Sequence, residues 1–348
     1  MQKFIFSIAV LAGLVLSACN TGTDVTPDPP VSMTFPSQFP APVYQFSQNE
    51  VTDKGFKLGK ALFYDPILSI DSTISCASCH QQNGAFAHVG HDLSHGVRDL
   101  LGTRNTPPIQ NLAWHSSFFW DGGAANLDVQ PLGPIKNPVE MDLSWTEALH
   151  RLRRSPTYFG KFKDVFNIQD TSELTTALLG KAFSQFMNAL VSANAKYDKY
   201  KKGEVTLSAE ETAGMSLFQQ KCASCHKGEL FSDFSYKNNG LKPSSPADSG
   251  RYMITYNLNE LYQFKVPSLR NIEVSYPYMH DGRYSTLESV LNHYVNKVYD
   301  MPTLDPSLKQ SGTVGIPLTS TEQANIIAFL KTLTDTEFLN DKRFKKEY

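Results

Sequence analysis

The chain has 348 residues, of which 41% are hydrophobic and 19% charged, and its formal net charge at pH 7 is −2. This near-neutral balance gives no indication of a nucleic-acid partner, which a strongly basic composition would favour. With a short leader and linker set aside, the length suits two domains of roughly 100–150 residues each.

The chain begins with a segment that is typical of protein export. Residues 1–18 carry Lys3 in a short basic region, followed by an apolar run from Phe4 to Leu16. The next residues, Leu16-Ser17-Ala18-Cys19, resemble a bacterial lipobox, in which Cys19 becomes the lipidated first residue of the mature protein. An ordinary signal peptide or a transmembrane anchor is the alternative, although the apolar run is short for a membrane span. We therefore expect an exported bacterial lipoprotein, attached to a membrane by its lipid alone, in the periplasm or at the cell envelope.

Residues 19–45 are interpreted as the lipidated cysteine followed by an extended tether. The stretch from Asn20 to about Pro42 is rich in threonine, proline, aspartate and serine, a composition that favours extended linkers. The folded body is expected to begin with a short helix between Val51 and Tyr64. Asp65-Pro66 should end that helix, because the residue before a proline avoids helical geometry.

One pentapeptide occurs twice: Cys76-Ala77-Ser78-Cys79-His80 is repeated as Cys222-Ala223-Ser224-Cys225-His226. Cys-x-x-Cys-His is the attachment signature of a c-type haem. On a helical turn the two thiols lie on one side of the backbone, where they can reach the two vinyl groups of a porphyrin. The histidine that follows can then give a ring nitrogen to the iron. The sequence therefore predicts two covalently bound haem c groups.

The same cysteine spacing can also hold structural zinc or form a redox dithiol. A zinc site takes four ligands, and no second cysteine pair lies near either motif. One lipidated cysteine and four haem-bound cysteines account for all five in the chain, so none is left for a disulfide. Haem c is attached outside the cytoplasm in bacteria, which agrees with the export segment.

The first motif is followed by loops that carry polar and aromatic side chains. A histidine-rich loop contains His88, His91 and His95, which could supply a sixth iron ligand or simply be solvated. The aromatic cluster Ser117–Gly123 would ordinarily belong to the core, but its closeness to a haem loop also suits a role near the cofactor. The segment Asn137–Met141 shows no periodicity and is expected to be a packed loop.

The chain then becomes helical. Ser144-x-x-Glu147 is a capping box for a helix that runs through Leu152. Thr171 or Ser172 should cap a longer helix that runs to about Ala195. A charged linker, Lys196–Glu204, is expected to separate the two domains.

In the second half, Ser208-x-x-Glu211 should cap a helix that leads into the second motif, and Leu230–Asp248 should be a loop. A further helix is expected from Ser285 or Thr286 to about Val298, and a last helix should be capped by Ser320-x-x-Gln323. Almost no stretch alternates as a strand would. The predicted fold is all-α, with two cytochrome c-like domains at residues 46–200 and 201–348, each carrying one haem c and joined by long ordered loops.

The order and spacing of these motifs resemble the bacterial di-haem cytochrome c peroxidases and the related maturation enzymes of methylamine dehydrogenase. The resemblance extends roughly from Phe56 to Asp335. Besides the two haem motifs, it is carried by Arg104-Asn105-Thr106-Pro107, Phe119-Trp120-Asp121-Gly122, Gln130, Pro134-Ile135-x-Asn137-Pro138-x-Glu140-Met141, Pro267-Ser268-Leu269-Arg270-Asn271 and Tyr278-Met279-His280-Asp281-Gly282.

The resemblance implies a reactive, peroxidatic haem in the first domain and an electron-transfer haem in the second. It makes His80 and His226 the proximal iron ligands and puts Trp120 between the two haems. Gln130 and Glu140 would be the amide and the acid/base of the peroxide pocket. A single carboxylate over the iron can take a proton from peroxide and return it to the leaving oxygen. The alternative for Glu140 is an ordinary exposed acid in a loop.

The resemblance also implies one calcium ion, held by the Asn105 side chain and by the backbone carbonyls of Ser275 and Pro277, since calcium prefers hard oxygen ligands. In the peroxidases a histidine of the loop after the first motif often caps the resting reactive haem. His95 lies nearest the matching place, with His91 as the second choice, and neither spacing matches fully.

The second haem shows a clearer departure from the peroxidases. They have a methionine ligand where this chain has Tyr294, and the maturation enzyme uses a tyrosine there. Methionine raises a haem potential, whereas an oxygen ligand should favour ferric iron and lower it. Met301 and His293 are alternative ligands, and Tyr294 could instead pack against the ring without ligating. Gly123 also replaces an arginine of the family pattern.

We therefore predict an enzyme that reduces hydrogen peroxide to two waters with electrons from a small soluble redox protein, either a cytochrome c or a cupredoxin. One alternative is a maturation-type di-haem oxidase that acts through high-valent iron on a protein or organic substrate. The other is a di-haem electron carrier with no catalytic role. The sequence leaves a homodimer open.

Overall fold

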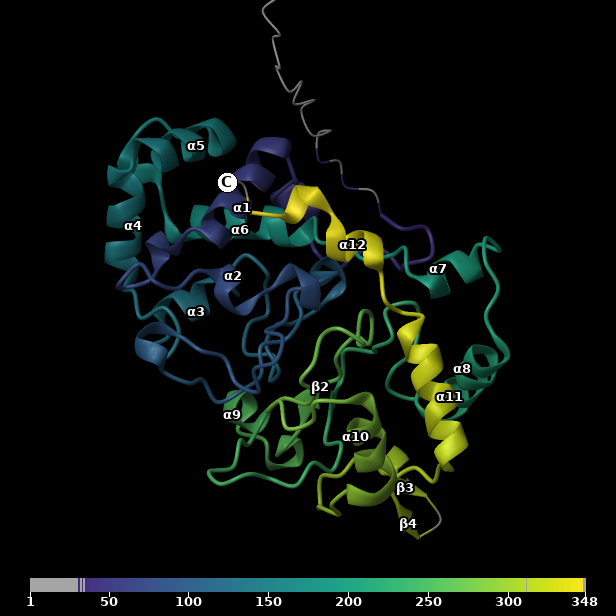
Figure 1. Cartoon of the computed structure of the whole chain (residues 1–348). Helices are drawn as coiled ribbons and strands as arrows, with labels where there is room; N and C mark the ends of the chain where they lie inside the picture. Colours follow the sequence, from purple (N-terminus) through teal and green to yellow (C-terminus); the bar gives the residue numbers. More distant parts are fainter. Residues whose placement is uncertain (1–30, 32, 34, 311, 347–348) are drawn as a thin grey trace, which may run out of the picture. The chain divides into compact units, whose positions relative to one another are not determined.

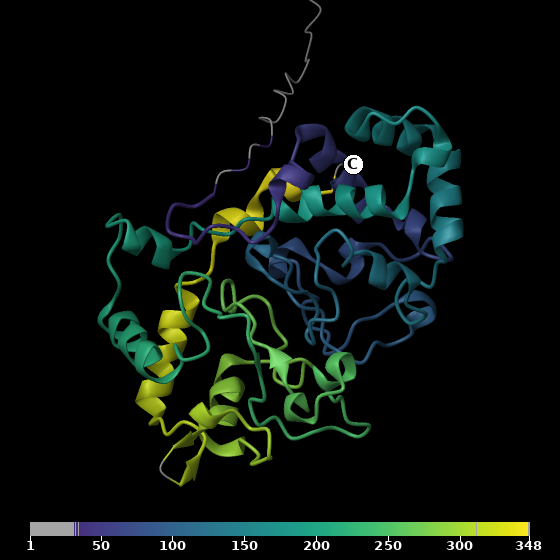
Figure 2. The same cartoon turned by 180° about the vertical axis from the view of Figure 1, so that it is seen from behind.

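A computed structural model describes residues 31, 33, 35–310 and 312–346. The predicted export signal, the lipidation site at Cys19 and residues 20–30 of the predicted tether lie outside the described residues. Residues 35–45 of that tether pack on the folded body, since Phe39 is buried with its ring centroid 5.0 Å from that of Trp114 and the Val43 N–H donates to the Ala113 carbonyl at 2.9 Å. Helices and loops make up most of the described chain, which confirms the all-α class (Figures 1 and 2). None of the helices in the described ranges is both long and apolar enough to cross a membrane.

The helices are short and the strands shorter. The α-helices are α1 (Asp53–Tyr64), α2 (Cys76–Cys79), α3 (Leu132–Lys136), α4 (Trp145–Arg154), α5 (Pro156–Phe166), α6 (Thr176–Asn188), α7 (Lys196–Lys201), α8 (Ala209–Lys221), α9 (Tyr252–Thr255), α10 (Leu287–Asn292), α11 (Ser320–Lys331) and α12 (Thr336–Asn340), and a π-helix covers His293–Lys297. Two antiparallel ribbons join β1 (Tyr236–Lys237) to β2 (Phe264–Lys265) and β3 (Lys309–Gln310) to β4 (Thr313–Val314).

The first hydrophobic core is built on the packing of α1 against α6. Phe63 of α1 and Phe186 of α6 are almost fully buried, and their ring centroids are 5.0 Å apart. Only a glycine at position 59 allows the two helices to approach this closely, because a Cβ there would lie 2.2 Å from the Ala182 carbonyl oxygen. Each buried phenylalanine contributes about 1.5–3 kcal/mol by leaving water. This core surrounds the first haem motif, on α2.

The second core repeats this plan around the second haem motif. Phe218 of α8 packs on Phe329 of α11, with ring centroids 5.3 Å apart. A glycine again permits the close contact, since a Cβ at Gly214 would lie 1.9 Å from the Asn325 carbonyl oxygen. In Figure 1, α8 and α11 run side by side, away from α1 and α6.

The end of the chain returns to the first core. Phe338 of α12 and Phe344 pack among the aromatic side chains of α1 and α6. The Gln82 side chain, just after the first motif, donates hydrogen bonds to the carbonyl oxygens of Phe338 and Asp341 at 3.2 and 2.9 Å. The last residues therefore help to cover the first haem motif, while the bounds of the two domains stay predictions.

Several predicted helix bounds are correct, because local capping decides them. Ser144 caps α4, Ser208 caps α8 with a reciprocal capping box, and Thr286 caps α10. The helix predicted as the last, α11, starts one residue earlier than predicted, since Thr319 and Glu322 form its capping box. Two further helices were not predicted: α5, which begins at Pro156 after a Ser155 cap, and α12, which follows α11 after an Asp335 cap.

The helix predicted from Thr171 or Ser172 to Ala195 is wrong at both ends. Thr175 caps α6, which ends at Asn188. The chain then runs beside Asn111, whose side chain accepts from the Ser192 backbone N–H at 2.9 Å and donates to the Ser192 carbonyl at 3.0 Å. Tertiary hydrogen bonds therefore end the helix where sequence periodicity would continue it.

The predicted charged linker is also wrong, because residues 196–201 form α7. Asp198 of this helix caps the Ala195 backbone N–H and forms a bidentate ion pair with Arg270, and neither charged side chain is exposed. The Arg270 guanidinium also lies 4.6 Å from the Phe39 ring centroid. A segment that looks solvated in sequence thus contributes a buried ion pair to the core.

Candidate functional site

The first Cys-x-x-Cys-His motif forms the helical turn that haem attachment needs. Cys76 to Cys79 make up α2, and the His80 backbone N–H donates to the Cys76 carbonyl at 2.9 Å. Nδ1 of His80 lies 2.6 Å from the Phe86 carbonyl oxygen, and a carbonyl can only accept, so Nδ1 carries the proton. Nε2 is therefore left as the ligand atom, and burial lowers the pKa of His80 to about 4, which keeps the ring neutral as ligation requires.

The second motif has the same geometry, although it follows α8 as a single turn. The His226 backbone N–H donates to the Cys222 carbonyl at 3.0 Å, and His226 Nδ1 donates to the Phe231 carbonyl at 3.2 Å. Both accepting phenylalanines are in left-handed backbone geometry, with φ of 63° at Phe86 and 52° at Phe231. Their side chains are fully buried, and this packing offsets the strain that glycine would avoid.

The thiols do not have the chemistry of a redox dithiol. Reactive Cys-x-x-Cys pairs have lowered thiol pKa values. Here burial raises the pKa of Cys76 to about 12, of Cys79 to about 11 and of Cys222 to about 12. Among the described residues no cluster of three or more histidine, cysteine or acidic side chains could hold a metal ion by itself. Thioether attachment to a haem remains the chemistry that fits both motifs.

Glu140 lies in a loop that packs against the first motif. Its carbonyl accepts from the Val97 backbone N–H at 2.7 Å, and a Cβ at Gly96 would lie 2.5 Å from the Glu140 Cα, so only glycine allows this approach. Burial raises the pKa of Glu140. The Cys79 thiol donates to the His95 carbonyl at 3.3 Å, so the loop that packs against Glu140 at Gly96 also touches the first motif. Glu140 is therefore half-buried and not an exposed loop acid.

Asn137 positions the Glu140 carboxylate, which the sequence analysis did not foresee. Its Nδ2 donates to Glu140 Oε1 at 2.8 Å, and its Oδ1 accepts from the Val139 backbone N–H at 3.2 Å. The second contact fixes which end of the amide faces Glu140. One carboxylate oxygen is thereby held, while no hydrogen bond from the described residues reaches Oε2.

Gln130 lies in the turn before α3 and is half-buried. Its carbonyl accepts from the Gly133 backbone N–H at 3.1 Å. The segment from α3 to Glu140 is then tied together by the Met141 N–H, which donates to the Pro134 carbonyl at 3.3 Å. The structure thus puts Gln130 and Glu140 on one folded segment, while no hydrogen bond in the described part joins their side chains.

Trp120 connects segments from the two halves of the protein. Its indole Nε1–H donates to the Asn105 carbonyl at 2.9 Å, and its own carbonyl accepts from the Lys265 backbone N–H of β2 at 2.7 Å. The Asn105 N–H in turn donates to the His280 carbonyl at 2.7 Å. Trp120 therefore lies where the loops after the first motif meet the ribbon that follows the second.

The three loop histidines form one cluster, and they differ in burial and in hydrogen-bond partners. The rings of His88 and His91 stack with centroids 4.0 Å apart, and His95 meets both rings edge-on. His95 Nδ1 faces the exposed Asp99 carboxylate at 3.2 Å, and His91 Nδ1 donates to the Val89 carbonyl at 3.2 Å. His88 is the buried member, and its Nδ1 has no partner among the described residues. From sequence, His95 was the expected capping ligand of the first haem and His91 the second choice, while His88 was only one member of the loop.

The three residues expected at a calcium site are buried and lie in neighbouring loops. The Asn105 side chain donates from Nδ2 to the carbonyls of His91 and Asp92, both at 3.1 Å, which leaves its Oδ1 as an oxygen ligand. Ser275 and Pro277 are buried, and the carbonyl of Tyr276 between them accepts from the Gly90 N–H at 3.4 Å. A calcium ion at this place stays a prediction.

Tyr294 lies on the π-helix that follows α10, beside the second motif. Burial raises the pKa of its phenol to about 12, the Asn239 side chain donates a hydrogen bond that opposes this shift, and the charges of Cys222 and Cys225 add to it. The neighbouring His293 points elsewhere, since its Nε2 lies 3.0 Å from the Asn239 carbonyl oxygen. Helical turns of this wide kind occur often at functional sites. Tyr294 is half-buried and Met301 is buried, and the sixth ligand of the second haem stays a prediction.

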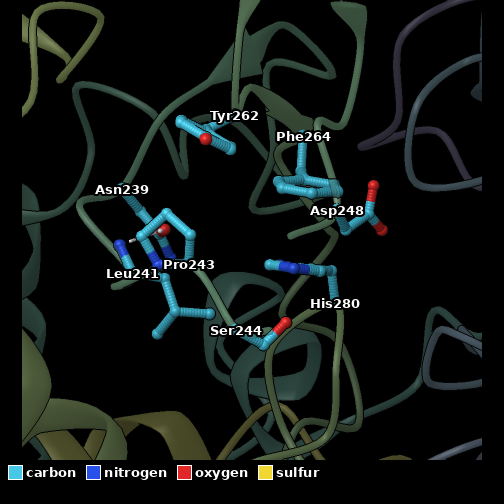
Figure 3. A pocket seen from close by; sticks show the side chains of 8 residues that line it. All are labelled: Asn239, Leu241, Pro243, Ser244, Asp248, Tyr262, Phe264 and His280. Atoms are coloured by element: carbon cyan, nitrogen blue, oxygen red, sulfur yellow. Dashed lines mark hydrogen bonds between the residues drawn. The ribbon is translucent and has the colours of Figure 1, made fainter. Parts of the chain in front are cut away.

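A small pocket of about 10 Å³ adjoins Asn239 and is lined by the ring of His280 (Figure 3). That ring stacks on Phe264 with centroids 3.6 Å apart. Burial lowers the pKa of His280 to about 4, against the charge of Asp281 and Asp248. The pocket has room for about one water molecule and not for an organic substrate.

Comparison with known proteins agrees with these centres. Residues 53–206 match the profile of a family described as di-haem cytochrome c peroxidase. The chain is 34% identical over 288 residues to the methylamine utilization protein MauG of Methylorubrum extorquens, covering 82% of this chain and 79% of that protein. It is 35% identical over 287 residues to the cytochrome c551 peroxidase of Nitrosomonas europaea, covering 80% and 79%. The chain belongs to the di-haem cytochrome c peroxidase family.

The fold of this di-haem protein agrees with its family. A crystal structure of a MauG-like protein associated with microbial copper homeostasis superposes with a TM-score of 0.80 at 31% identity, covering 90% of this chain and 98% of that one. The family implies two haem c groups. The residues present fit them, since each motif offers two thiols on one turn and a histidine whose Nδ1 is already used. His80 and His226 would hold the irons, and Cys76, Cys79, Cys222 and Cys225 the porphyrins.

Proposed function

We propose that this peroxidase-type oxidoreductase reduces hydrogen peroxide to two waters, with electrons from a small soluble cytochrome c or cupredoxin. The observation that carries the proposal is the half-buried Glu140 carboxylate, which Asn137 holds by a 2.8 Å hydrogen bond in the loops packed on the first motif. A surface electron carrier would have no use for a carboxylate held in this way. The near relation to a cytochrome c551 peroxidase supports the choice of substrate and donor class.

The proton steps follow from the geometry of Glu140. Reduction of one peroxide consumes two protons and two electrons and forms two waters. With haem bound on His80, the iron supplies the centre at which the O–O bond is reduced. The ionised Glu140 carboxylate would take a proton from the bound peroxide and return it to the oxygen that leaves as water. Asn137 keeps Oε1 occupied, so that Oε2 carries the proton. Gln130 is proposed to orient the peroxide with its amide.

The two centres are proposed to have unequal tasks. Electrons would enter singly at the haem on His226, and Trp120 would assist their transfer toward the haem on His80. In support, Trp120 is hydrogen-bonded to segments from both halves of the chain. Tyr294 is proposed as the sixth ligand of the second haem, because its phenol is buried beside the second pair of thiols.

The resting state of the first haem depends on the histidine loop. His95 remains the proposed capping ligand, with His91 as the alternative. The burial of His88 and its unpartnered Nδ1 add it to the candidates. A capped iron would need prior reduction to release the ligand, whereas an open iron would react with peroxide directly.

Further parts of the proposal concern the setting of the enzyme. We propose one calcium ion held by Asn105, Ser275 and Pro277, supported by the free Oδ1 of Asn105 and the burial of the other two residues. Lipidation at Cys19 would anchor the enzyme in the periplasm or at the cell envelope, supported by the lipobox-like sequence. A homodimer stays open within this proposal.

The second candidate function is a maturation-type oxidase that acts on a protein or organic substrate. Tyr294 favours it, because tyrosine rather than methionine lies beside the second motif. The 34% identity to a MauG protein points the same way. Peroxide would then oxidise the substrate and not a small electron donor.

The test is the peroxide-dependent oxidation of a reduced small cytochrome by the full protein with both haems loaded. It should be run on the protein as isolated and after mild pre-reduction, with Glu140→Gln as the matched variant. Rapid turnover that Glu140→Gln nearly abolishes, with both haem spectra intact, is the expected result. Spectral change without turnover in either state would move the assignment to the oxidase. No reaction with peroxide would leave an electron carrier, and full activity in Glu140→Gln would refute the acid/base role.

A further inference from the structure

Two cations, the buried Lys265 and the half-buried Arg251, lie where the loop after the first motif meets the β1–β2 ribbon. Lys265 of β2 is 9% exposed, and its Nζ donates to the Ser117 carbonyl at 2.6 Å. Arg251 donates from Nη1 to the carbonyls of Asp121 and Gly122 at 2.8 and 3.2 Å. Within the described part of the chain, neither cation forms an ion pair with a carboxylate, although buried charges are normally paired.

The nearest carboxylates are already used by a third cation. Arg104 binds Asp121 through Nη1, and it binds both oxygens of Asp248 through Nε and Nη2. The other oxygen of Asp121 accepts from the Gly123 N–H at 2.8 Å. Three cations therefore face two carboxylates, which leaves one positive charge in excess. Burial lowers the pKa of Lys265 to about 8, with only the charge of Asp121 opposing it.

A buried imidazole without partners lies beside this excess charge. Both ring nitrogens of His115 are buried and have no hydrogen-bond partner among the described residues, and the same holds for Nε of Arg251. Burial lowers the pKa of His115, and the charge of Lys265 lowers it further. The ring centroid of His115 is 4.3 Å from that of Phe234. Two N–H donors, one of the neutral His115 ring and the Nε–H of Arg251, thus lack an acceptor among the described residues.

This place is adjacent to the second haem motif. The Asp233 N–H donates to the Cys225 carbonyl at 2.9 Å, and three residues later Tyr236 pairs with Lys265 in the ribbon. The carbonyl of Pro267, two residues after Lys265, accepts a hydrogen bond from the His226 ring. A haem c carries two propionate carboxylates on the porphyrin edge away from its thioether bonds. Such a carboxylate supplies the negative charge and the acceptor oxygens that the cluster lacks.

We propose that Lys265 binds a propionate of the haem attached at Cys222 and Cys225, with Arg251 and His115 as further donors. The inference rests on the two haem groups of the family and not on peroxide turnover. An ammonium held near the porphyrin favours the ferrous state, which carries one positive charge less at the iron. It also keeps the propionate ionised, so the haem potential should hardly depend on pH near neutrality.

The test compares Lys265→Gln and Lys265→Arg with the unchanged holoprotein by redox titration of both haems at several pH values. Lys265→Gln should favour the ferric state of the second haem roughly tenfold. This lowers its reduction potential by about 59 mV, since the couple transfers one electron. Its potential should also become pH-dependent near neutrality, because the released propionate can now take a proton. Lys265→Arg should retain both properties.

The matched control is Lys237→Gln, on the paired strand, since the Lys237 ammonium is ion-paired with Asp305 at 2.9 Å. It should give a smaller shift and no new pH dependence. The proposal is overturned if Lys265→Gln leaves both potentials unchanged, matches Lys237→Gln, or moves only the haem on His80. If Lys265→Gln does not mature with two haems, Arg251→Gln replaces it, and an unchanged second-haem potential there overturns the proposal. The readout is the potential of each haem and not peroxide turnover, so a failure of the proposed activity can be told apart from a failure of this proposal.

Discussion

The hydrogen bond from Asn137 to Glu140 offers the sharpest test of the peroxide pocket. Asn137→Ala removes the N–H that donates to Glu140 Oε1 at 2.8 Å and the Oδ1 that accepts from the Val139 N–H, but it leaves the backbone–backbone hydrogen bonds of the loop in place. This donor favours the ionised carboxylate, so its loss should raise the pKa of Glu140 above the level that burial already sets. A hydrogen bond to a charged group is worth about 1.5–3 kcal/mol.

The sign of the effect follows from the role of Glu140 as a base. Peroxide can lose its proton only to the ionised carboxylate, so kcat/KM rises with pH through the pKa of Glu140. Since about 1.4 kcal/mol corresponds to a factor of ten, Asn137→Ala should lower kcat/KM roughly tenfold or more on the acid side. The loss should nearly vanish at alkaline pH, where the carboxylate is ionised in both proteins.

The assay is the pH profile of kcat/KM for peroxide, with the haem absorption spectra as a check that the centres are intact. The double variant Asn137→Ala with Glu140→Gln is the control, because a residue that acts only through Glu140 adds no further loss once Glu140 is gone. An equal loss at every pH, or an acid limb that does not move, would refute the positioning role of Asn137.

Three further predictions concern other parts of the molecule. Tyr294→Met should raise the potential of the second haem, because methionine favours ferrous iron more than an oxygen ligand does; an unchanged potential in a redox titration would mean that Tyr294 packs beside the ring without ligating. Trp120→Phe removes the indole hydrogen bond to the Asn105 carbonyl and should slow electron transfer between the haems in stopped-flow absorbance, and equal rates would exclude Trp120 from the path. Asp198→Ala should destabilise the fold by about 3–5 kcal/mol, since it leaves Arg270 buried without its partner. Thermal unfolding would measure this loss, and Glu337→Ala, at an exposed pair with Lys199, should cost less than about 1 kcal/mol.

Features that depend on local chemistry could be predicted without the structure. The two pentapeptides form the expected turns, because a helical turn needs only neighbouring residues. Ser144, Ser208 and Thr286 cap helices where the sequence puts them, since a cap is a contact across three residues. The family markers likewise followed from order and spacing alone.

Features that depend on residues far apart in the sequence could not be predicted without the structure. Residues 196–201 look like a solvated linker, but Asp198 meets Arg270 across more than seventy residues and both are buried. The end of α6 is decided by Asn111, and the first core is completed by Phe338 and Phe344 from the end of the chain. No window of neighbouring sequence contains these contacts.

The features of the candidate site also fall into those set by local sequence and those set by the tertiary fold. The sequence by itself determined the type of cofactor, its number and the family, because covalent attachment requires a fixed local motif. Only the tertiary structure decided which polar groups lose their water, as with Glu140, His88 and Lys265. Burial is a property of the whole fold, since a side chain is desolvated by residues brought from elsewhere in the chain, and the chemistry of these groups depends on that desolvation.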